Sequence, residues 1–140
     1  MLKLAGCIIQ DANGHVLLIH RNTDKYDHWE VPGGKVDDGE LAHDAAIREL
    51  REELGVDVAI LEPLGTVEFE DRGKPMHYSW FAASIVEGEP RIVEPHIHDD
   101  FRYIDVCAPD QSMSFSLAAQ GLIQQLAEGQ VRLNPLYACE

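Results

Sequence analysis

The chain has 140 residues, of which 11 are Lys or Arg and 25 are Asp or Glu, so its formal net charge is −14 with histidine neutral. This length predicts one domain over residues 1–140, and the hydrophobic content of 45% is that of a globular protein. The sequence has no apolar run of the ~20 residues that a membrane-spanning helix needs. So acidic a chain lacks the basic surface with which proteins wrap a nucleic-acid polymer.

The first part of the chain predicts a β-hairpin. Residues 4–10 form an apolar strand, residues 11–14 carry the Asp, Asn and Gly of a tight turn, and residues 16–19 form the returning strand. Residues 29–31 are a short extended piece that ends at the Pro-Gly-Gly sequence of residues 32–34.

The rest of the chain predicts two amphipathic helices and further strands. The first helix covers residues 41–54 and ends at Gly55. Strands are expected at residues 56–67, 76–86 and 101–106. The second helix has Ser114 as its N-cap and apolar residues at helical spacing until Gly129. This order predicts an α/β fold with a mixed sheet and helices on its faces.

The cysteines bear on the compartment. Cys7, Cys107 and Cys139 are odd in number and show no Cys-x-x-Cys spacing. This argues against a disulfide framework and a thiolate zinc site, and favours a reducing compartment. Residues 4–7 look like a lipoprotein cleavage box, but only three residues precede them, where a signal needs an apolar stretch of about 7–15. We therefore expect a cytoplasmic protein.

Acidic residues gather before and within the first predicted helix. Seven lie within 17 residues: Asp37, Asp38, Glu40, Asp44, Glu49, Glu52 and Glu53. Residues three and four apart share a helix face, so Glu49, Glu52 and Glu53 project together and repel one another. A hard divalent cation such as Mg²⁺ or Mn²⁺ would turn that repulsion into coordination. A solvated acidic face balanced by Arg48 and Arg51 explains the same residues without a metal.

The register of this segment distinguishes the two explanations. Gly34 is followed after five residues by Glu40, after seven more by Arg48-Glu49-Leu50, and then by Glu52-Glu53 and Gly55-Val56. The segment resembles the signature of the Nudix (MutT-like) hydrolases at every defined position. Looser similarity to the family's surroundings extends the resemblance over most of residues 3–128.

The resemblance implies the Nudix fold, an α/β/α sandwich with a mixed β-sheet and helices on both faces. It also implies Mg²⁺-dependent attack of water on a diphosphate, with Mn²⁺ as a substitute ion. By resemblance, the metal ligands and base candidates are Glu49, Glu52 and Glu53, and the Gly33 carbonyl is a further ligand. Arg48 would orient the glutamates, Glu40 would support the turn before the helix, and Gly34 and Gly55 would have backbone roles.

Residues outside the signature are candidates for substrate contacts. Arg21 and Lys35 could meet the outer phosphates, and Trp29 or Tyr78 could stack on a base, although core packing is the more frequent role of an aromatic side chain. A polar loop offers a further ligand or base among Glu94, His96, His98 and Asp99, although an exposed polar loop is the more frequent explanation of such a segment.

We therefore expect an enzyme that cleaves the diphosphate linkage of a nucleoside triphosphate or a related nucleotide, releasing pyrophosphate and a nucleoside monophosphate. A nucleotide-sugar or a dinucleoside polyphosphate is the alternative substrate. A non-catalytic, nucleotide-sensing module of the same fold is the alternative from another class, and the presence of all three glutamates argues against it. The expected partner is a small nucleotide, and we expect neither a nucleic-acid polymer nor a membrane as a partner. Because members of the Nudix family are often dimers, the resemblance also suggests a homodimer as an assembly to test.

Overall fold

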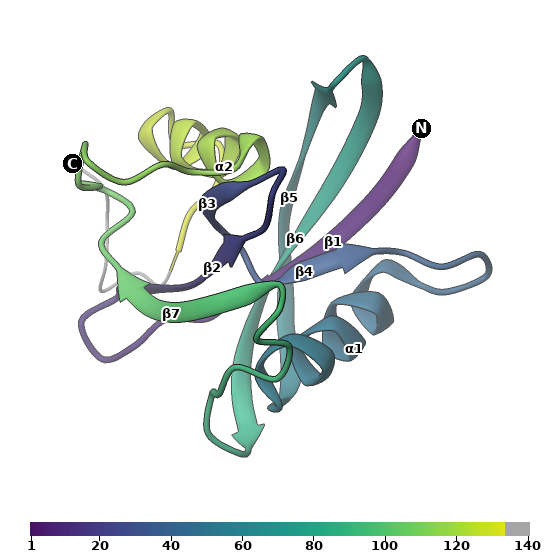
Figure 1. Ribbon diagram of the computed structural model, residues 1–140, viewed down its shortest axis with the longest axis vertical. Helices are drawn as coiled ribbons and strands as arrows, with labels where there is room; N and C mark the ends of the chain where they lie inside the picture. Colours follow the sequence, from purple (N-terminus) through teal and green to yellow (C-terminus); the bar gives the residue numbers. More distant parts are fainter. Residues whose placement is uncertain (134–140) are drawn as a thin grey trace.

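Two β-sheets lie between two helices in the computed structural model, which describes residues 1–133 (Figure 1). The larger sheet has the strand order β4-β1-β6-β5, and the smaller, antiparallel sheet has the order β3-β2-β7. Strand β1 runs parallel to β6 and antiparallel to β4, so the larger sheet is mixed. The elements are β1 (Leu2–Ile8), β2 (Val16–Asn22), β3 (Asp27–Glu30), β4 (Gly33–Lys35), α1 (Ala42–Leu54), β5 (Asp57–Asp71), β6 (Lys74–Glu87), β7 (His98–Ile104) and α2 (Leu117–Ala127).

The hydrophobic core is divided into two clusters, one on each side of the sheets. Leu17 and Ile19 of β2 pack in the cluster that contains the apolar face of α1. Val16 and Leu18, their neighbours on the same strand, pack in the cluster that contains α2. Successive strand residues point to opposite faces, so this alternation places one helix on each side. The predicted fold class, a mixed sheet with helices on both faces, is confirmed.

The predicted hairpin at the start of the chain is wrong beyond its turn. The chain does reverse there, because the Leu17 N–H donates to the Ile9 carbonyl at 2.9 Å and Gln10 forms a bridge with Val16. Strands β1 and β2 then enter different sheets. The turn residues specify a local reversal, but the partners of β1 are the distant strands β4 and β6, which local pairing rules do not reveal.

Helix α1 follows the prediction closely. It ends at Gly55, which has the left-handed φ of 68° and whose N–H donates to the Arg51 carbonyl. Strands β5 and β6 are confirmed and form one long antiparallel pair, and β7 begins at His98, three residues earlier than predicted.

The predicted start of helix α2 is wrong by two residues. Its N-cap is Ser116, whose hydroxyl oxygen accepts the N–H of Ala119 at 3.1 Å. Ser114 instead lies beside β3, where its carbonyl accepts the Trp29 N–H and the Ser116 N–H donates to the Trp29 carbonyl. These two bonds hold residues 114–116 alongside the strand, so the helix cannot begin before Ser116.

The cysteines differ in state. Cys7 is a free, buried thiol, whereas Cys107 is disulfide-bonded, contrary to the expectation of reduced thiols, and Cys139 lies outside the described residues. Within residues 1–133, neither helix is long and apolar enough to cross a membrane.

Candidate active site

Two neighbouring glycines of strand β4 lie against one turn of helix α1. The Gly33 N–H donates to Glu53 Oε1 at 2.7 Å. A methyl group at Gly34 would lie 2.6 Å from Glu49 Cδ, so the missing side chain is what leaves room for this carboxylate. Glu49 and Glu53 are one helical turn apart and share a face. The glycine pair therefore brings the backbone of β4 against both carboxylates.

Arg48 ties this arrangement together. Its Nε and Nη2 donate to the two oxygens of Glu40, each at 3.0 Å, and Nη2 also donates to the Lys35 carbonyl at 2.9 Å. Its Nη1 donates to Glu49 at 3.0 Å and to Glu52 at 3.2 Å. The hydrogen bonds from Arg48 and a backbone N–H lower the pKa of Glu40 to about 2. Glu52 is half exposed. Among the contacts of the described residues, Glu52 is linked to Glu49 only by the Arg48 guanidinium, which bonds to both.

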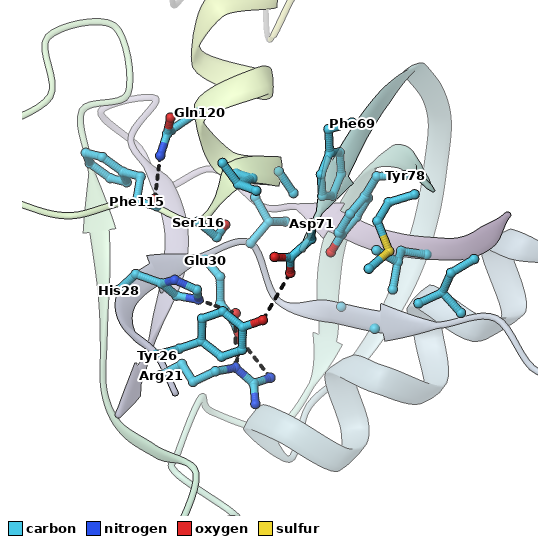
Figure 2. A pocket seen from close by; sticks show the side chains of 18 of the residues that line it. Arg21, Tyr26, His28, Glu30, Phe69, Asp71, Tyr78, Phe115, Ser116 and Gln120 are labelled. Carbon is cyan, nitrogen blue, oxygen red and sulfur yellow. Dashed lines mark hydrogen bonds and ion pairs between the residues drawn. The ribbon is translucent and has the colours of Figure 1, made fainter. Parts of the chain in front are cut away.

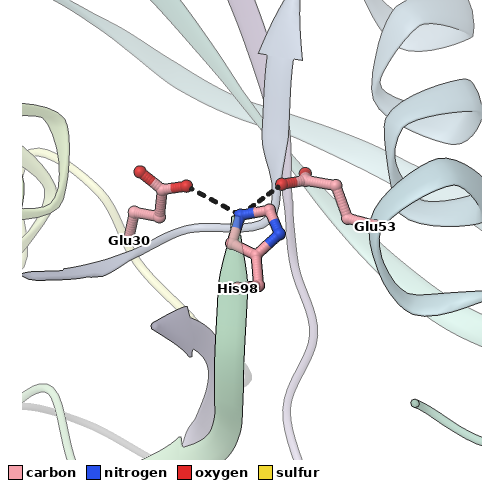
Figure 3. A group of neighbouring side chains, drawn as sticks. All are labelled: Glu30, Glu53 and His98. Atoms are coloured by element: carbon pink, nitrogen blue, oxygen red, sulfur yellow. Dashed lines mark hydrogen bonds and ion pairs between the residues drawn. The ribbon is translucent and has the colours of Figure 1, made fainter. Parts of the chain in front are cut away.

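Glu53 lies at the centre of a buried cluster. Its side chain is 4% exposed, and its Oε2 is 3.3 Å from His98 Nε2. The same nitrogen is 3.3 Å from Glu30 Oε1, so the imidazole stands between two carboxylates (Figure 3). Burial, followed by the negative charges of Glu30 and Glu49, raises the pKa of Glu53 well above its ordinary value of 4.5. Glu53 is thus a buried carboxyl group whose ionised form would be stabilised by a nearby positive charge.

Glu30 has the opposite balance. Burial alone would raise its pKa, but hydrogen bonds from His28 and His98 and the charge and hydrogen bonds of Arg21 lower it to about 2. Arg21 Nε lies 3.0 and 3.2 Å from the two Glu30 oxygens, and His28 Nε2 lies 3.0 Å from one of them. Glu30 is therefore an ionised anchor that fixes three basic side chains.

The donors of this region suit a divalent cation. One ligand atom each from Glu30, Glu53 and His98 lies within 4.8 Å of the others. Burial and the charges of Glu52 and Glu94 raise the pKa of Glu49 despite its hydrogen bond from Arg48. Carboxylates that repel one another at a buried site are stabilised by a hard cation, and oxygen donors are the ligands that Mg²⁺ prefers. The residues present thus fit a divalent metal on the Glu49–Glu53 face of α1.

A pocket of about 330 Å³ opens beside this cluster (Figure 2). It is lined by Gly33, Gly34 and the Arg21–Glu30 pair, and also by Phe69, Phe115 and the first turn of α2. On one side the Tyr26 hydroxyl donates to Asp71 Oδ2 at 3.0 Å. The pocket therefore combines charged groups next to the glycine pair that contacts Glu53 with aromatic side chains.

The predicted substrate residues separate into two groups. Arg21, Lys35 and Tyr78 all line the pocket. Tyr78 is nevertheless buried and stacks on Trp80, with ring centroids 4.2 Å apart. Trp29 does not line this pocket; it is buried in the core, and the Arg102 guanidinium lies over its ring.

The four candidates of the polar loop also separate. His98 belongs to the buried cluster, and Glu94 is near enough to Glu49 to raise its pKa. His96 is exposed. Asp99 accepts hydrogen bonds from His20 at 2.6 Å and Asn22 at 2.9 Å, away from the cluster. Residues of β7 alternate between faces, so His98 and Asp99 point in opposite directions.

Glu30 is the site residue that the sequence analysis missed. It is flanked by Trp29 and Val31, which are both buried. The available signal was a charged residue between two core residues, two positions before a Pro-Gly-Gly sequence, because strand alternation turns it away from the core that holds its neighbours.

The sequence over residues 3–124 matches the family described as NUDIX domain. The chain belongs to the Nudix family. The matched range contains β4, α1 and all members of the buried cluster. As a Nudix hydrolase, the protein acts on acid anhydrides of phosphorus, and the family assignment made from residues 34–56 is confirmed.

Named relatives and solved structures agree with this assignment. A CTP pyrophosphohydrolase of Escherichia coli strain K12 is 29% identical over 120 residues, covering 84% of each chain. An 8-oxo-dGTP diphosphatase of Proteus vulgaris is 39% identical over 75 residues, covering 51% of this Nudix chain and 67% of the relative. The crystal structure of a MutT NUDIX hydrolase from Burkholderia pseudomallei has a TM-score of 0.78 and 29% identity, covering 89% of this chain and 96% of that one.

Proposed function

We propose that this Nudix hydrolase cleaves the diphosphate linkage of a nucleoside triphosphate with Mg²⁺, releasing pyrophosphate and a nucleoside monophosphate. The observation that carries the proposal is the pocket, which is lined both by the glycine pair next to Glu53 and by aromatic side chains. A triphosphate has the matching chemistry, because it carries both charged phosphates and an aromatic base. The names of two relatives, a CTP pyrophosphohydrolase and an 8-oxo-dGTP diphosphatase, support a triphosphate substrate.

The metal ligands in this proposal are Glu49, Glu52 and Glu53, with the Gly33 carbonyl beside them. When bound, Mg²⁺ neutralises phosphate charge and lowers the pKa of water. Arg48 holds the glutamates in register through its hydrogen bonds to Glu49 and Glu52. A carboxylate of this face takes the proton of the attacking water.

The substrate is held by residues on the pocket wall. Arg21 and Lys35 would neutralise the outer phosphates, since both line the pocket together with Gly33 and Gly34. Phe69 and Phe115, which line the same pocket, offer flat surfaces for a base. Tyr78 is part of the pocket wall. We also propose that the protein is a single domain that acts on small nucleotides in the cytoplasm. Light scattering would measure whether it forms a homodimer.

A panel of nucleotides with Mg²⁺ or Mn²⁺ tests the function directly. Nucleoside triphosphates, nucleotide-sugars and dinucleoside polyphosphates are compared, with products identified by chromatography. We expect the triphosphates to have the highest kcat/KM, with pyrophosphate and monophosphate as products. Preference for a nucleotide-sugar or dinucleoside polyphosphate would favour the alternative substrate class, and no turnover of any compound would favour a nucleotide-sensing module.

A charge-removing variant tests the role of the buried carboxylate. Glu53→Gln keeps an oxygen for the Gly33 N–H but removes the charge, so kcat/KM should fall about 10³-fold while circular dichroism is unchanged. Glu62→Gln is the matched control, because Glu62 is an exposed residue of β5. Turnover by Glu53→Gln at the wild-type rate would contradict the assignment of this residue.

A further inference from the structure

Asp71 places a negative charge in the wall of a pocket to which we assign a polyanionic substrate. It is the last residue of β5, and its carboxylate is directed into the pocket beside Tyr26 (Figure 2). Within residues 1–133, the Tyr26 hydroxyl is the hydrogen-bond partner of this carboxylate, and no basic side chain forms an ion pair with it. A carboxylate repels phosphate groups, so Asp71 is suited to another part of the substrate.

The two carboxylates that line the pocket among the described residues differ in how fully they are bonded. Both oxygens of Glu30 accept hydrogen bonds, from Arg21, His28 and His98. Asp71 accepts one at Oδ2, whereas Oδ1 has no donor in the described part of the chain. An ionised carboxylate can only accept hydrogen bonds. Asp71 Oδ1 is therefore the open, charged acceptor of this pocket.

The other oxygen of Asp71 is held in place from the opposite side of the pocket. Tyr26 lies in the loop between β2 and β3, and its hydroxyl donates to Asp71 Oδ2 at 3.0 Å. The guanidinium carbon of Arg72, the next residue, lies 5.2 Å from the centre of the Tyr26 ring. Two successive residues at the end of β5 thus contact one tyrosine, which fixes the direction in which the carboxylate points.

Strand alternation places Asp71 next to an aromatic surface. Phe69 and Asp71 are two residues apart on β5, where the pairing with β6 is regular, so their side chains share a face about 7 Å apart. Both line the pocket, whereas Glu70 between them is exposed and does not. A base that stacks on the Phe69 ring therefore has its edge within reach of Asp71.

We propose that Asp71 is a specificity-determining residue that accepts a hydrogen bond from the exocyclic amino group of the base. The pocket then favours cytosine, adenine or guanine nucleotides over those of uracil or thymine, in which a carbonyl oxygen would face the carboxylate. Tyr26 is a positioning residue, because it holds Oδ2 and leaves Oδ1 for the base. This inference rests on the proposed function, since it assigns the base to the same pocket.

Two pairs of triphosphates isolate the amino group. CTP carries an amino group where UTP carries a carbonyl, and GTP carries an amino group that ITP lacks. We expect kcat/KM to be about 10–100-fold higher for the amino-bearing member, the range for a hydrogen bond to a charged group. A preference in either pair supports the proposal, and equal values in both pairs would overturn it.

Asp71→Asn separates base selection from a structural role of the same side chain. The Tyr26 O–H keeps the oxygen of the new amide on its side, so an N–H₂ group takes the place of Oδ1 and donates to a carbonyl instead. The ratio of kcat/KM for CTP to that for UTP should fall about tenfold or more, with thermal melts unchanged. Glu70→Gln is the matched control, because this exposed neighbour lies outside the pocket. A wild-type ratio in Asp71→Asn would reduce Asp71 to a structural contact of Tyr26.

Binding measurements keep this proposal distinct from the proposed function. Isothermal titration calorimetry with CMP and UMP measures base preference without hydrolysis, and CMP should bind wild type more tightly but lose that advantage in Asp71→Asn. If no triphosphate is hydrolysed, the proposed function fails, while the CMP and UMP affinities still test Asp71. Hydrolysis with equal affinities for CMP and UMP would overturn the role of Asp71 and leave the proposed function standing. No detectable binding of either monophosphate would also overturn the role of Asp71.

Discussion

Gly34 shows how the site depends on a side chain that is absent. Its backbone φ is not in the left-handed region, so conformational freedom is not what the position requires. What it requires is space, because a methyl group there would lie 2.6 Å from the Glu49 carboxyl carbon. The contact is with the end of a flexible side chain, which can move away at little cost to folding. The cost of a larger residue therefore falls on the position of the carboxylate.

Gly34→Ala should accordingly lower activity more than stability. Displacing Glu49 by the order of 1 Å is expected to reduce kcat/KM about 10²-fold, with the melting temperature nearly unchanged. Gly129→Ala is the opposite control, since Gly129 has φ 75° and open space around it. It should lose about 1–2 kcal/mol of stability and keep its activity. Steady-state kinetics and thermal melts distinguish the two, and equal activity in wild type and Gly34→Ala would contradict the steric argument.

The residues of the site differ in how far the sequence could reveal them. Glu49 and Glu53, like Arg48 and Glu52, are four residues apart on one helix, where spacing alone places the side chains of each pair on a common face. Glu30 and His98 lie 68 residues apart and meet only because β3 and β7 both pair with β2. No local pattern encodes that meeting. His98 was therefore only one of four loop candidates, and Glu30 was missed.

At the scale of elements, the start of helix α2 is set by backbone hydrogen bonds between strand β3 and the residues that precede the helix. Ser114 and Ser116 are both chemically suitable caps, and the predicted cap was Ser114. The backbone bonds between Trp29 and residues 114 and 116 exclude it, and leave Ser116 to cap the Ala119 N–H. The bounds of helix α1, by contrast, could be predicted from its apolar stripe and Gly55. The strand partners of β1 could not, since they are set by tertiary pairing.

The two serines make a matched pair for measurement. Ser116→Ala should destabilise the protein by about 1 kcal/mol, because an N–H of the first turn of α2 loses its acceptor. Ser114→Ala should change stability by less than about 0.5 kcal/mol, the usual range for an exposed position, since its structural bond is made by its backbone carbonyl. Urea denaturation measures both. A larger loss at Ser114 would return the N-cap to that residue.

For the molecule as a whole, the placement of its carboxylates matters more than the net charge of −14. In Glu53 and Glu49 the folded state raises the pKa, chiefly by burial, so folding favours their protonated forms. Their contribution to stability is present at low pH and is lost as pH rises above 4.5 through the raised values. Glu30, with its pKa lowered to about 2, acts in the other direction and loses its contribution as pH falls from 4.5 towards 2.

Divalent cations should therefore stabilise the protein more at high pH. At high pH a larger fraction of Glu49 and Glu53 is ionised, and Mg²⁺ at about 100 times its Kd should add about 2.7 kcal/mol. At lower pH protons compete with the ion for both carboxylates, so the gain should be smaller. Thermal melts with Mg²⁺ or with EDTA, at several pH values and constant ionic strength, measure this. The same gain in Glu53→Gln as in wild type would show that the ion binds elsewhere.

The cluster also spans the boundary between the two sheets. Glu53 and Gly33 belong to the helix and strand of the larger sheet, whereas Glu30 and His98 belong to the smaller one. Neither half contains a complete set of groups, and the 3.3 Å contact between His98 Nε2 and Glu53 Oε2 crosses the boundary between them. The site is therefore complete only while the two sheets stay in contact at this point. Separating them there would part Glu53 from Glu30 and His98 without breaking the hydrogen bonds within any strand or helix.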